Sequence, residues 1–387
     1  MNDGGAYAIY HSSLGILSQG IELKILAMDL LKSRDKEREI PAEFIVQTKF
    51  ESVVVDNRIK PLRAFINLFG RRSYFTERFY SEKYCKKLTE ILQQNTFDII
   101  QLEHLYLGLY IDVIRKYSNA KIVLRAQNVE NQLWYGYLDK LKNPFVKFFL
   151  FIAAKRLEIF EKQIATSVDG IMSLSDEDAL YFKDYSHKIK IAAIPTGLNI
   201  KKNSEIDIKK RYEGLPILFH LGSMDWKPNV LGLKWFIKEV LPLLKKNHPE
   251  IQLIIAGKNM PPWFFKQADR NLIVQGMVKD ATLFQEDKAI LIVPLLTGSG
   301  IRIKILESMA LGKTIISTRV GASGITYEDG KNILIANDPK EFSEQIRRCI
   351  LSEDLCRSIG KNAQILISEK YELNKIGAEM STFYAAL

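Results

Sequence analysis

The chain has 387 residues, a net charge of +10 and an isoelectric point near 9.2. Its 47% apolar and 26% charged content excludes a disordered chain and leaves room for two or three globular domains. The three cysteines have no metal-ligand spacing, which argues against a disulfide framework and a zinc site. No apolar run approaches 18 residues, which argues against a helix that spans a membrane. We see no signal peptide or nucleic-acid motif, so we expect a cytoplasmic protein whose basic surface meets a lipid surface or a phosphorylated substrate, not nucleic acid.

The first residues contain two glycines, Gly4 and Gly5, which predict a turn. Apolar residues at helical spacing follow, and residues 22–28 predict a strand. Locally, the glycines are equally well explained as a plain N-terminal turn or as a loop that approaches a ligand.

Two segments, 58–90 and 142–155, combine basic and aromatic residues, with Arg63 and Arg72 among the first and a phenylalanine-rich run in the second. This pattern suits a surface that faces anionic lipid headgroups. It also suits amphipathic helices that pack their aromatic residues on their own domain. The arginines favour the first interpretation and the aromatics the second, and the 142–155 segment is too short to span a bilayer.

Polar residues follow two predicted strands of the first half. Residues 98–102 precede Glu103 and His104, and residues 121–125 precede Gln127, Asn128 and Glu130. Because the carboxyl ends of parallel strands line the ligand site of an open α/β sheet, we expect these five residues in a cleft. His104 is either a binding residue or a structural histidine with satisfied hydrogen bonds.

Further strands and a linker organise the remainder of the chain. Ser175 is a predicted N-cap, and the lysine-rich segment 199–213 is a predicted linker between domains. Residues 371–387 predict a C-terminal helix. The additional predicted strands are 170–174, 189–194, 216–221, 251–256 and 271–276.

The most informative pattern is a strand, a glycine-rich loop, a helix and a second strand. An apolar run over 289–296 ends in Thr297-Gly298-Ser299-Gly300. Apolar residues then recur at helical spacing, Gly312 is a predicted C-cap, and residues 314–318 form the next strand. This order is typical of the βαβ unit of a parallel sheet.

The chemistry of this loop indicates an anion. Gly298 and Gly300 let backbone N–H groups approach a ligand at the positive end of the helix. Arg302 and Lys304 lie in the predicted first turn, where cations are unfavourable unless a negative group occupies the loop. Glu307 is placed to accept hydrogen bonds from a ribose diol. The alternative is a capped helix with two solvated basic residues.

Residues 291–325 resemble the nucleotide-sugar signature of family 4 retaining glycosyltransferases with the GT-B fold. In that family a Glu-x7-Glu motif opens this helix, and its second glutamate corresponds to Glu307. Ser299 stands where the first glutamate would be, and Gln127 where the family usually has histidine. The resemblance is strong over 216–325, moderate over 121–198 and weak over 1–100.

The segment from Gly222 to Asn229 is also similar to the family's diphosphate-binding loop. Lys227 approximately matches its lysine, whereas Ser223 stands in place of its arginine. Arg302 is therefore expected to take over the missing arginine's role, because a guanidinium can hold two phosphate oxygens at once.

The resemblance implies an α/β protein with two Rossmann-like parallel-sheet domains that face each other across a cleft. Residues 1–198 would form the acceptor-side domain, 214–370 the donor domain and 371–387 a helix that crosses back to the first domain. In the family, an apolar strand precedes the Gly-Gly loop. Because this strand is absent before Gly4, we expect a truncated start, since a missing central strand would expose ladder groups.

The resemblance also implies three sets of site residues, which overlap. The catalytic set is Arg302, Lys227, Ser299 and His104. The acceptor-side set is Glu103, Gln127, Asn128 and Glu130. The donor-binding set is Gly4, Gly5, Gly222, Ser223, Lys227, Gly298, Gly300, Ile301, Arg302, Lys304 and Glu307.

The implied reaction moves a sugar from a nucleotide-diphosphate sugar to a hydroxyl of a cell-surface glycan or glycolipid, with retention of configuration. Fixed cations would stabilise the leaving diphosphate. We expect no metal or other cofactor, because we find no Asp-x-Asp pair suited to hold Mg²⁺ against the diphosphate. The expected partners are the nucleotide sugar, a glycan or lipid-linked acceptor, and the anionic inner face of the cell membrane.

Two alternatives stay open. Ser299 and Gln127 support a non-catalytic GT-B-like protein that binds a nucleotide or a sugar phosphate. A UDP-sugar epimerase of the same fold would need no acceptor. A phosphorylase of this fold would normally show a lysine for pyridoxal phosphate, and we identify none.

Overall fold

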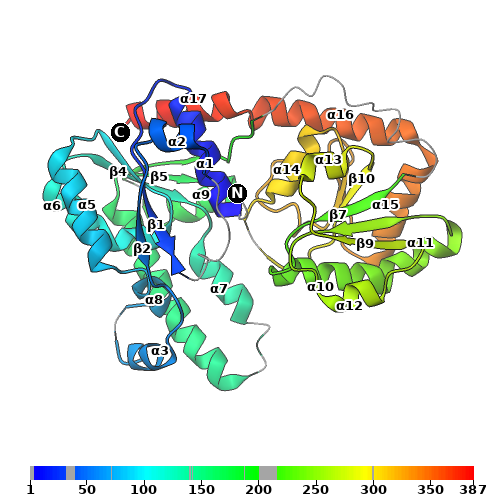
Figure 1. Ribbon diagram of the computed structural model, residues 1–387, viewed down its shortest axis with the longest axis horizontal. Coiled ribbons are helices and arrows are strands. Elements are labelled where there is room, and N and C mark those ends of the chain that lie inside the picture. Colours follow the sequence, from blue (N-terminus) through cyan, green and yellow to red (C-terminus); the bar gives the residue numbers. More distant parts are fainter. Residues whose placement is uncertain are drawn as a thin grey trace. The chain divides into compact units, whose positions relative to one another are not determined.

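The computed structural model of the protein describes residues 4–31, 40–70, 72–138, 141, 143–186, 188–199, 216–298 and 300–387. The chain forms two compact units (Figure 1). The first contains the residues up to Gly197 together with Leu373–Leu387, and the second spans Leu198–Glu372. No helix among the described residues is both long and apolar enough to cross a bilayer.

The second unit is built on a parallel sheet, with β12-β11-β10-β7-β8-β9 as the order of its described strands. The chain runs outward from β7 through β8 to β9 and then returns to the other side of β7 as β10. Ligands bind beside such a reversal of strand order, at the carboxyl ends of the strands. The strands are β7 (Leu218–Leu221), β8 (Leu253–Ala256), β9 (Leu272–Gly276), β10 (Ile290–Val293), β11 (Thr314–Ser317) and β12 (Leu334–Ile335).

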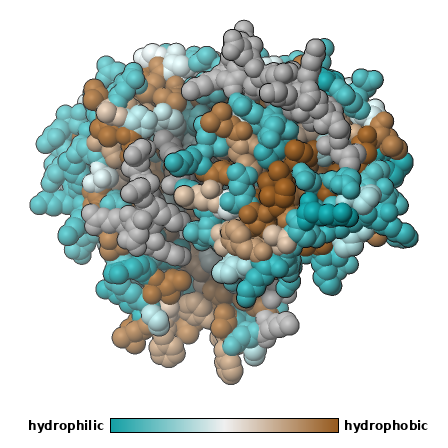
Figure 2. All heavy atoms as spheres, turned by 45° about the vertical axis from the view of Figure 1, so that its right-hand side comes forward, coloured by the Kyte–Doolittle hydropathy of each residue, from teal (hydrophilic) through white to brown (hydrophobic). Residues whose placement is uncertain are grey.

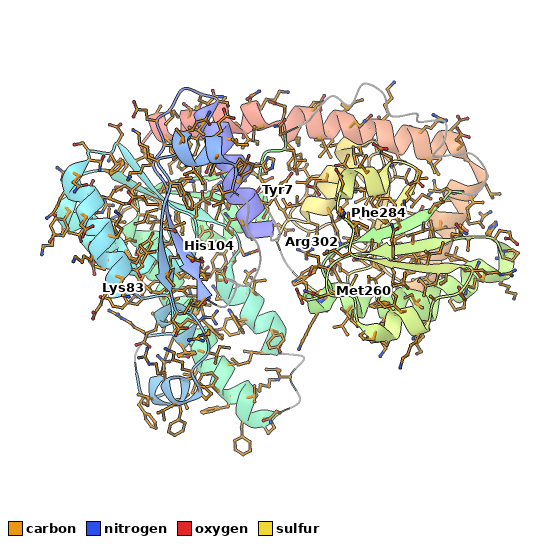
Figure 3. The ribbon with its side chains drawn as sticks, in the orientation of Figure 1. Tyr7, Lys83, His104, Met260, Phe284 and Arg302 are labelled. Carbon is orange, nitrogen blue, oxygen red and sulfur yellow. The ribbon has the colours of Figure 1, made fainter. Side chains whose placement is uncertain are left out.

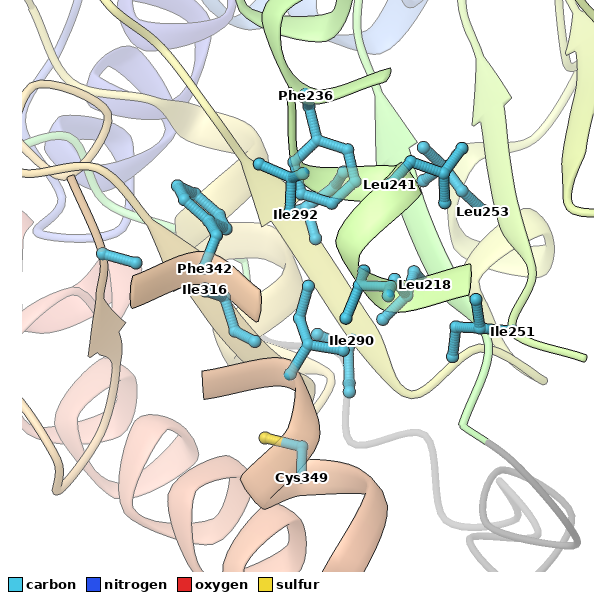
Figure 4. Packing of buried hydrophobic residues seen from close by; sticks show 14 of the residues in the cluster. Leu218, Phe236, Leu241, Ile251, Leu253, Ile290, Ile292, Ile316, Phe342 and Cys349 are labelled. Carbon is cyan, nitrogen blue, oxygen red and sulfur yellow. The ribbon is translucent and has the colours of Figure 1, made fainter. Parts of the chain in front are cut away.

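Helices of the second unit pack on this sheet. Phe236 and Phe342 from two of them meet Leu218, Ile290 and Ile292 of the sheet in one buried cluster (Figure 4). The helical elements are α10 (Lys227–Trp235), the π-helical turn η4 (Phe236–Val240), α11 (Leu241–Asn247), α12 (Pro262–Lys266), α13 (Ala281–Gln285), α14 (Ile303–Ala310), α15 (Pro339–Leu351) and α16 (Glu353–Lys370).

The first unit contains a parallel sheet in the order β3-β4-β5-β6 and a separate parallel pair, β1-β2. The two sheets share one core, in which Val55 of the pair joins Leu102, Leu124 and Ile171 of the larger sheet. The strands are β1 (Leu26–Leu30), β2 (Glu51–Val55), β3 (Ile99–Leu102), β4 (Lys121–Ala126), β5 (Gly170–Ser173) and β6 (Lys190–Ala193).

The helices of the first unit come from both ends of the chain. Its last helix packs closely on its first: a Cβ added at Gly377 would lie 2.1 Å from the carbonyl oxygen of Gly15. The helices are α1 (Gly4–Leu17), α2 (Ala42–Gln47), α3 (Pro61–Asn67), α4 (Tyr74–Glu77), α5 (Glu82–Gln94), the 3₁₀ helix η2 (Leu105–Tyr110), α6 (Ile111–Tyr117), α7 (Glu130–Leu138), α8 (Pro144–Ser167), α9 (Asp176–Lys183) and α17 (Leu373–Ala385).

The predicted α/β class with two parallel-sheet domains is confirmed, and the C-terminal helix returns to the first unit. Ser175 is the N-cap of α9, with its hydroxyl accepting from the Asp178 N–H at 3.2 Å. The predicted linker 199–213 lies, apart from residue 199, outside the described residues. The truncated start stays a prediction.

Three local predictions are wrong. Gly4 and Gly5 form the start of α1 instead of a separate turn before a helix. The strand predicted at 22–28 begins later, at Leu26, where its ladder with β2 starts. The donor-loop helix begins at Ile303, so Arg302 is its N-cap and does not lie in its first turn.

Candidate functional site

Two loops meet at the carboxyl ends of β7 and β8. The Gly222 N–H donates to the carbonyl of Ala256 at 3.1 Å. A Cβ added at Gly257 would lie only 1.7 Å from the Gly222 carbonyl oxygen, and Gly257 has φ +154°. Glycine at 257 therefore permits a close approach of two backbones beside the position where the strand order reverses.

Lys304 of α14 points its ammonium group toward the end of β7. Its Nζ lies 3.0 Å from Asn229 Oδ1 and 3.2 Å from His220 Nε2. The His220 Nδ1 lies 2.9 Å from the Ile292 carbonyl, so we assign the ring hydrogen to Nδ1, which leaves Nε2 to accept from the lysine. Both partners are thus neutral, and no carboxylate of the described residues forms an ion pair with Lys304.

Burial strongly affects the protonation of this pair. Burial, with the nearby charge of Arg302, lowers the pKa of Lys304 to about 7. Burial and the Lys304 charge hold the pKa of His220 well below its usual 6.5, which keeps the imidazole neutral. A negative ligand next to Nζ would oppose these effects and stabilise the charged lysine.

Arg302, which is labelled in Figure 3, lies directly before α14 and is buried. Its guanidinium carbon lies 4.7 Å from the ring centroid of Trp226, and it donates to the carbonyl of Gly300. Gly298 has φ +126°, and a Cβ there would lie 2.9 Å from Arg302 Nη2 and 3.0 Å from the Trp226 ring. Burial lowers the pKa of Arg302 to about 10.

The other predicted donor residues of this unit lie around these two cations. The backbone carbonyl of Ser223 accepts a 2.8 Å hydrogen bond from Asn229 Nδ2, which connects the loop after β7 to Asn229, a partner of Lys304. Lys227 is the exposed first residue of α10 and directly follows Trp226. Ile301 packs near Gly324, and Glu307 lies on α14. Ser299 lies outside the described residues.

His220 and Asn229 were missed by the sequence analysis. His220 is fully buried within β7, where its neighbours Leu218, Phe219 and Leu221 are apolar. A polar residue in a buried strand directly before a glycine turn is a usable signal, because a buried polar group needs a partner. Asn229 ends the segment that resembles the diphosphate-binding loop, but nothing in the sequence singled it out as the partner of Lys304.

In the first unit the structure joins Glu103 to Gln127. Glu103 accepts hydrogen bonds from Gln101 Nε2 at 2.5 Å, Gln127 Nε2 at 3.0 Å and Ser12 Oγ at 3.5 Å. Arg125 Nε lies 3.8 Å from the same carboxylate. Burial raises the pKa of Glu103 even though Arg125 opposes that shift. This arrangement is a satisfied polar network, and α1 contributes to it through Ser12.

A second pair in this unit consists of Asn128 and Glu130. The Glu130 carboxyl accepts from the Asn128 side chain, and burial raises its pKa while Asn128 and the charge of Arg78 act in the opposite direction. His104, labelled in Figure 3, stacks on Tyr106 with 5.0 Å between ring centroids. Arg78 was missed by the sequence analysis, because nothing in the pattern of segment 58–90 separates it from the other arginines.

No group of three or more His, Cys, Asp or Glu side chains among the described residues is placed to hold a metal ion. The described site of the second unit offers cations, backbone N–H groups and neutral acceptors. Such groups hold an anionic ligand, and the order of the strands places them where open α/β sheets bind one.

Comparison with known proteins finds a family match over the unit that contains this site. Residues 215–352 match the family described as glycosyl transferases group 1. A Klebsiella pneumoniae protein described as an uncharacterized 44.6 kDa protein in the cps region is 25% identical over 300 residues, which cover 75% of each chain.

Two solved structures show the same fold. Sucrose-phosphate synthase from Thermosynechococcus elongatus has a TM-score of 0.67 at 16% identity, over 98% of this chain and 92% of its own. Anabaena HepE in complex with UDP-glucose has a TM-score of 0.63 at 13% identity, over 100% and 98% of the two chains. The GT-B fold and the resemblance seen in residues 291–325 are confirmed.

Proposed function

We propose that this chain, whose residues 215–352 match the family described as glycosyl transferases group 1, transfers a sugar from a nucleotide-diphosphate sugar to a hydroxyl acceptor with retention of configuration and without a metal. The observation that carries the donor site is Lys304, a partly buried ammonium group held by two neutral partners beside Gly222. A buried charge without a counter-ion is costly, and a diphosphate would supply the missing charge.

The proposed class of donor is supported by both geometry and likeness. Lys304 and Arg302 provide two cations next to the N-terminus of α14, which suits a group with more than one negative charge. The similar HepE structure contains UDP-glucose. We therefore propose a nucleoside-diphosphate sugar, with Glu307 as the residue that accepts from the ribose.

In the proposed reaction, the bond between the sugar C1 and the diphosphate oxygen breaks, and its electron pair goes to the diphosphate. The acceptor oxygen bonds to C1 on the same face, and its proton passes to an oxygen of the departing diphosphate. Lys304 and Arg302 would stabilise the growing charge of the leaving group, which lowers the barrier because this charge is largest in the transition state.

For the acceptor, we propose a hydroxyl of a cell-surface glycan or glycolipid, reached at the inner face of the membrane. The polar groups of the first unit around Glu103, Gln127, Asn128 and Glu130 are the proposed acceptor side, with Arg78 added. Carboxylates, which accept hydrogen bonds, and side-chain amides, which both accept and donate them, suit sugar hydroxyls.

A thermal-shift panel of UDP, GDP, ADP and dTDP, their sugar conjugates and the free nucleosides tests the donor site. A ligand present at one hundred times its dissociation constant adds about 2.7 kcal/mol to the stability of the folded state. We expect one diphosphate and its sugar conjugate to raise the unfolding midpoint, and the matching nucleoside to have little effect.

Two variants sharpen the panel. Lys304→Met should abolish most of the diphosphate shift, whereas Lys234→Met, an exposed lysine of α10, should leave it unchanged. Equal losses in both variants would contradict the assignment. Binding without sugar transfer or donor hydrolysis would favour the non-catalytic alternative, and conversion of a UDP-sugar without an acceptor would favour the epimerase.

A further inference from the structure

Large apolar side chains gather at one end of the first unit, on α3 and on the N-terminal half of α8. Phe145 is 85% exposed, Phe69 82% and Phe148 65%. We call this surface the apolar tip; its residues are Ile59, Leu62, Phe65, Ile66, Phe69, Phe145, Val146, Phe148 and Phe151. Monomeric soluble proteins rarely leave so many large apolar side chains exposed together, so the tip indicates an interaction surface.

The two helices form one surface because polar contacts fix them to each other. Arg156 of α8 donates to the carbonyls of Asn67 at 2.7 Å and Leu68 at 2.8 Å, at the end of α3. The Ser73 hydroxyl, just after α3, donates to the Ala153 carbonyl of α8 at 2.8 Å. Figure 1 shows α3 beside the projecting end of α8, and Figure 2 shows apolar side chains gathered at the lower end of the view.

The apolar tip extends beyond the core of its unit. Helix α8 runs for 24 residues from its N-cap Asn143, but its first buried residue is Ala153. The nine residues 144–152 therefore project by about 14 Å at 1.5 Å per residue. A projecting ridge does not form the groove that encloses a peptide or a small ligand.

The charges around the tip select the partner. Residues 57–72 contain five basic residues and no acidic residue, and residues 143–157 contain three basic residues and no acidic residue. Asp56 pairs with Arg58 and Lys60 at 2.8 and 3.0 Å, so part of this charge is neutralised. Arg63, Arg72 and Lys147 are exposed. Exposed apolar side chains edged by cations match the boundary between acyl chains and anionic headgroups.

We propose that the apolar tip inserts into the surface of an anionic phospholipid bilayer and anchors the first unit there. Its phenylalanines enter the interface while Arg63, Arg72 and Lys147 contact the headgroups. The anchor is interfacial, since no described helix could span the bilayer. It depends only on residues 58–72 and 143–156, so it holds or fails independently of the donor site.

The structure also changes which part of segment 58–90 can face lipid. Tyr74, Phe79 and Tyr84 are buried, each with 5–7% exposure, and belong to the fold of the first unit. The lipid surface is restricted to the residues before Ser73, and α8 provides its other half. Packing within the first unit thus explains the buried aromatic residues from Tyr74 onward, and an exposed surface explains the apolar residues before Ser73.

Vesicle co-sedimentation of the full chain tests the proposal, with vesicles of phosphatidylcholine alone and of phosphatidylcholine with 30% phosphatidylglycerol. We expect binding to the anionic vesicles that persists in part at 0.5 M NaCl, because apolar insertion is not screened. The variant Phe65→Ser, Phe69→Ser, Phe145→Ser, Phe148→Ser should lower the partition coefficient at least tenfold at both salt concentrations.

Two comparison variants separate the contributions. Arg63→Gln, Arg72→Gln, Lys147→Gln should weaken binding at low salt and have little effect at high salt. The control Leu180→Ser, Phe265→Ser, Leu351→Ser removes exposed apolar residues outside the tip and should bind as the parent does. Because all these side chains are exposed, unfolding midpoints should stay within a few degrees of the parent.

Three results would overturn the proposal. The first is a parent chain that ignores anionic vesicles while it remains folded. The second is a four-serine variant that binds as well as the parent. The third is a parent chain that dimerises in solution and loses both dimer and vesicle binding with the four serines, which would make the tip a contact between copies. Nucleotide shifts measured on the same samples report the donor site separately.

Discussion

At the level of single residues, Lys304 makes the stability of the ligand-free protein depend on pH. Its pKa is about 7 in the folded state and near 10.4 in an unfolded chain. Between these values the unfolded chain binds more protons, so the contribution of Lys304 to stability rises with pH. We expect the difference in unfolding free energy between the parent and Lys304→Met to shift in favour of the parent from pH 7 to pH 10.

Chemical denaturation at several pH values measures this difference. Two ionisable groups lie beside Lys304. Arg302, with a pKa lowered to about 10, loses charge only at the upper end of this range, and His220 is neutral throughout it. Saturation with the diphosphate should raise the pKa of Lys304 and flatten the pH dependence over the lower part of the range. A difference that is constant with pH would mean that Lys304 titrates normally and is well solvated.

The same site shows what sequence reasoning can reach for individual residues. Arg302 and Lys304 were found because cations at the start of a helix are unusual and need a reason. His220 and Asn229 were not, since the contact between His220 and Lys304 joins residues 84 positions apart. Spacing predicts neighbours along one helix or strand, but a contact between two elements needs the register of the sheet.

At the level of elements, the close approach of the β7 and β8 ends depends on Gly257. Gly257→Ala would place a Cβ 1.7 Å from the Gly222 carbonyl oxygen, and backbone cannot move aside as a side chain does. We expect a loss of about 2–4 kcal/mol in unfolding free energy, together with loss of the diphosphate-induced thermal shift. Chemical denaturation and the thermal-shift assay measure the two effects.

Gly330→Ala is the matched control for this prediction. Gly330 also has positive φ, at +78°, but a Cβ there meets nothing within 4 Å. Its replacement should cost about 1 kcal/mol, from the backbone conformation alone, and should leave nucleotide binding intact. If the two variants lost the same stability, the collision with Gly222 would not be the cause.

Prediction at this level succeeded for buried strands and failed at surfaces. The run 289–296 contains β10, because a strand that is buried along its whole length is apolar at every position. The segments 58–90 and 142–155 could not be divided, because an aromatic residue has the same helical spacing in a core and on a projecting ridge. Only the end of the core at Ala153 separates these cases.

At the level of the whole molecule, the first unit depends on α17. Phe383 is 2% exposed and packs in a cluster with Ile16, Val123, Met172 and Ile194. Phe383→Ala should destabilise this unit by about 3–5 kcal/mol, a large part of a domain's total stability. Thr382→Ala on the exposed side of the same helix should change it by less than about 0.5 kcal/mol.

Chemical denaturation measures the loss of stability, and hydrogen exchange of individual amides shows which of the two units has lost it. In Phe383→Ala, amides of β4 and β5 should lose protection, while those of β7 and β10 keep it. Loss of protection in both units to the same extent would mean that they unfold together. The general architecture was predictable because two series of parallel strands and a helix at the end are visible in the sequence. The split of the first unit into two sheets was not, since strand order leaves no periodic signal.

The composition of the first unit from both ends of the chain has a consequence during translation. The second unit is continuous from Leu198 to Glu372, so all of it is available before the ribosome adds α17. The first unit, although most of it is synthesised earlier, lacks a core helix until α17 emerges. Domains usually fold in the order in which they are made. Here the later unit can finish first, and the earlier one must wait on the ribosome with part of its core open.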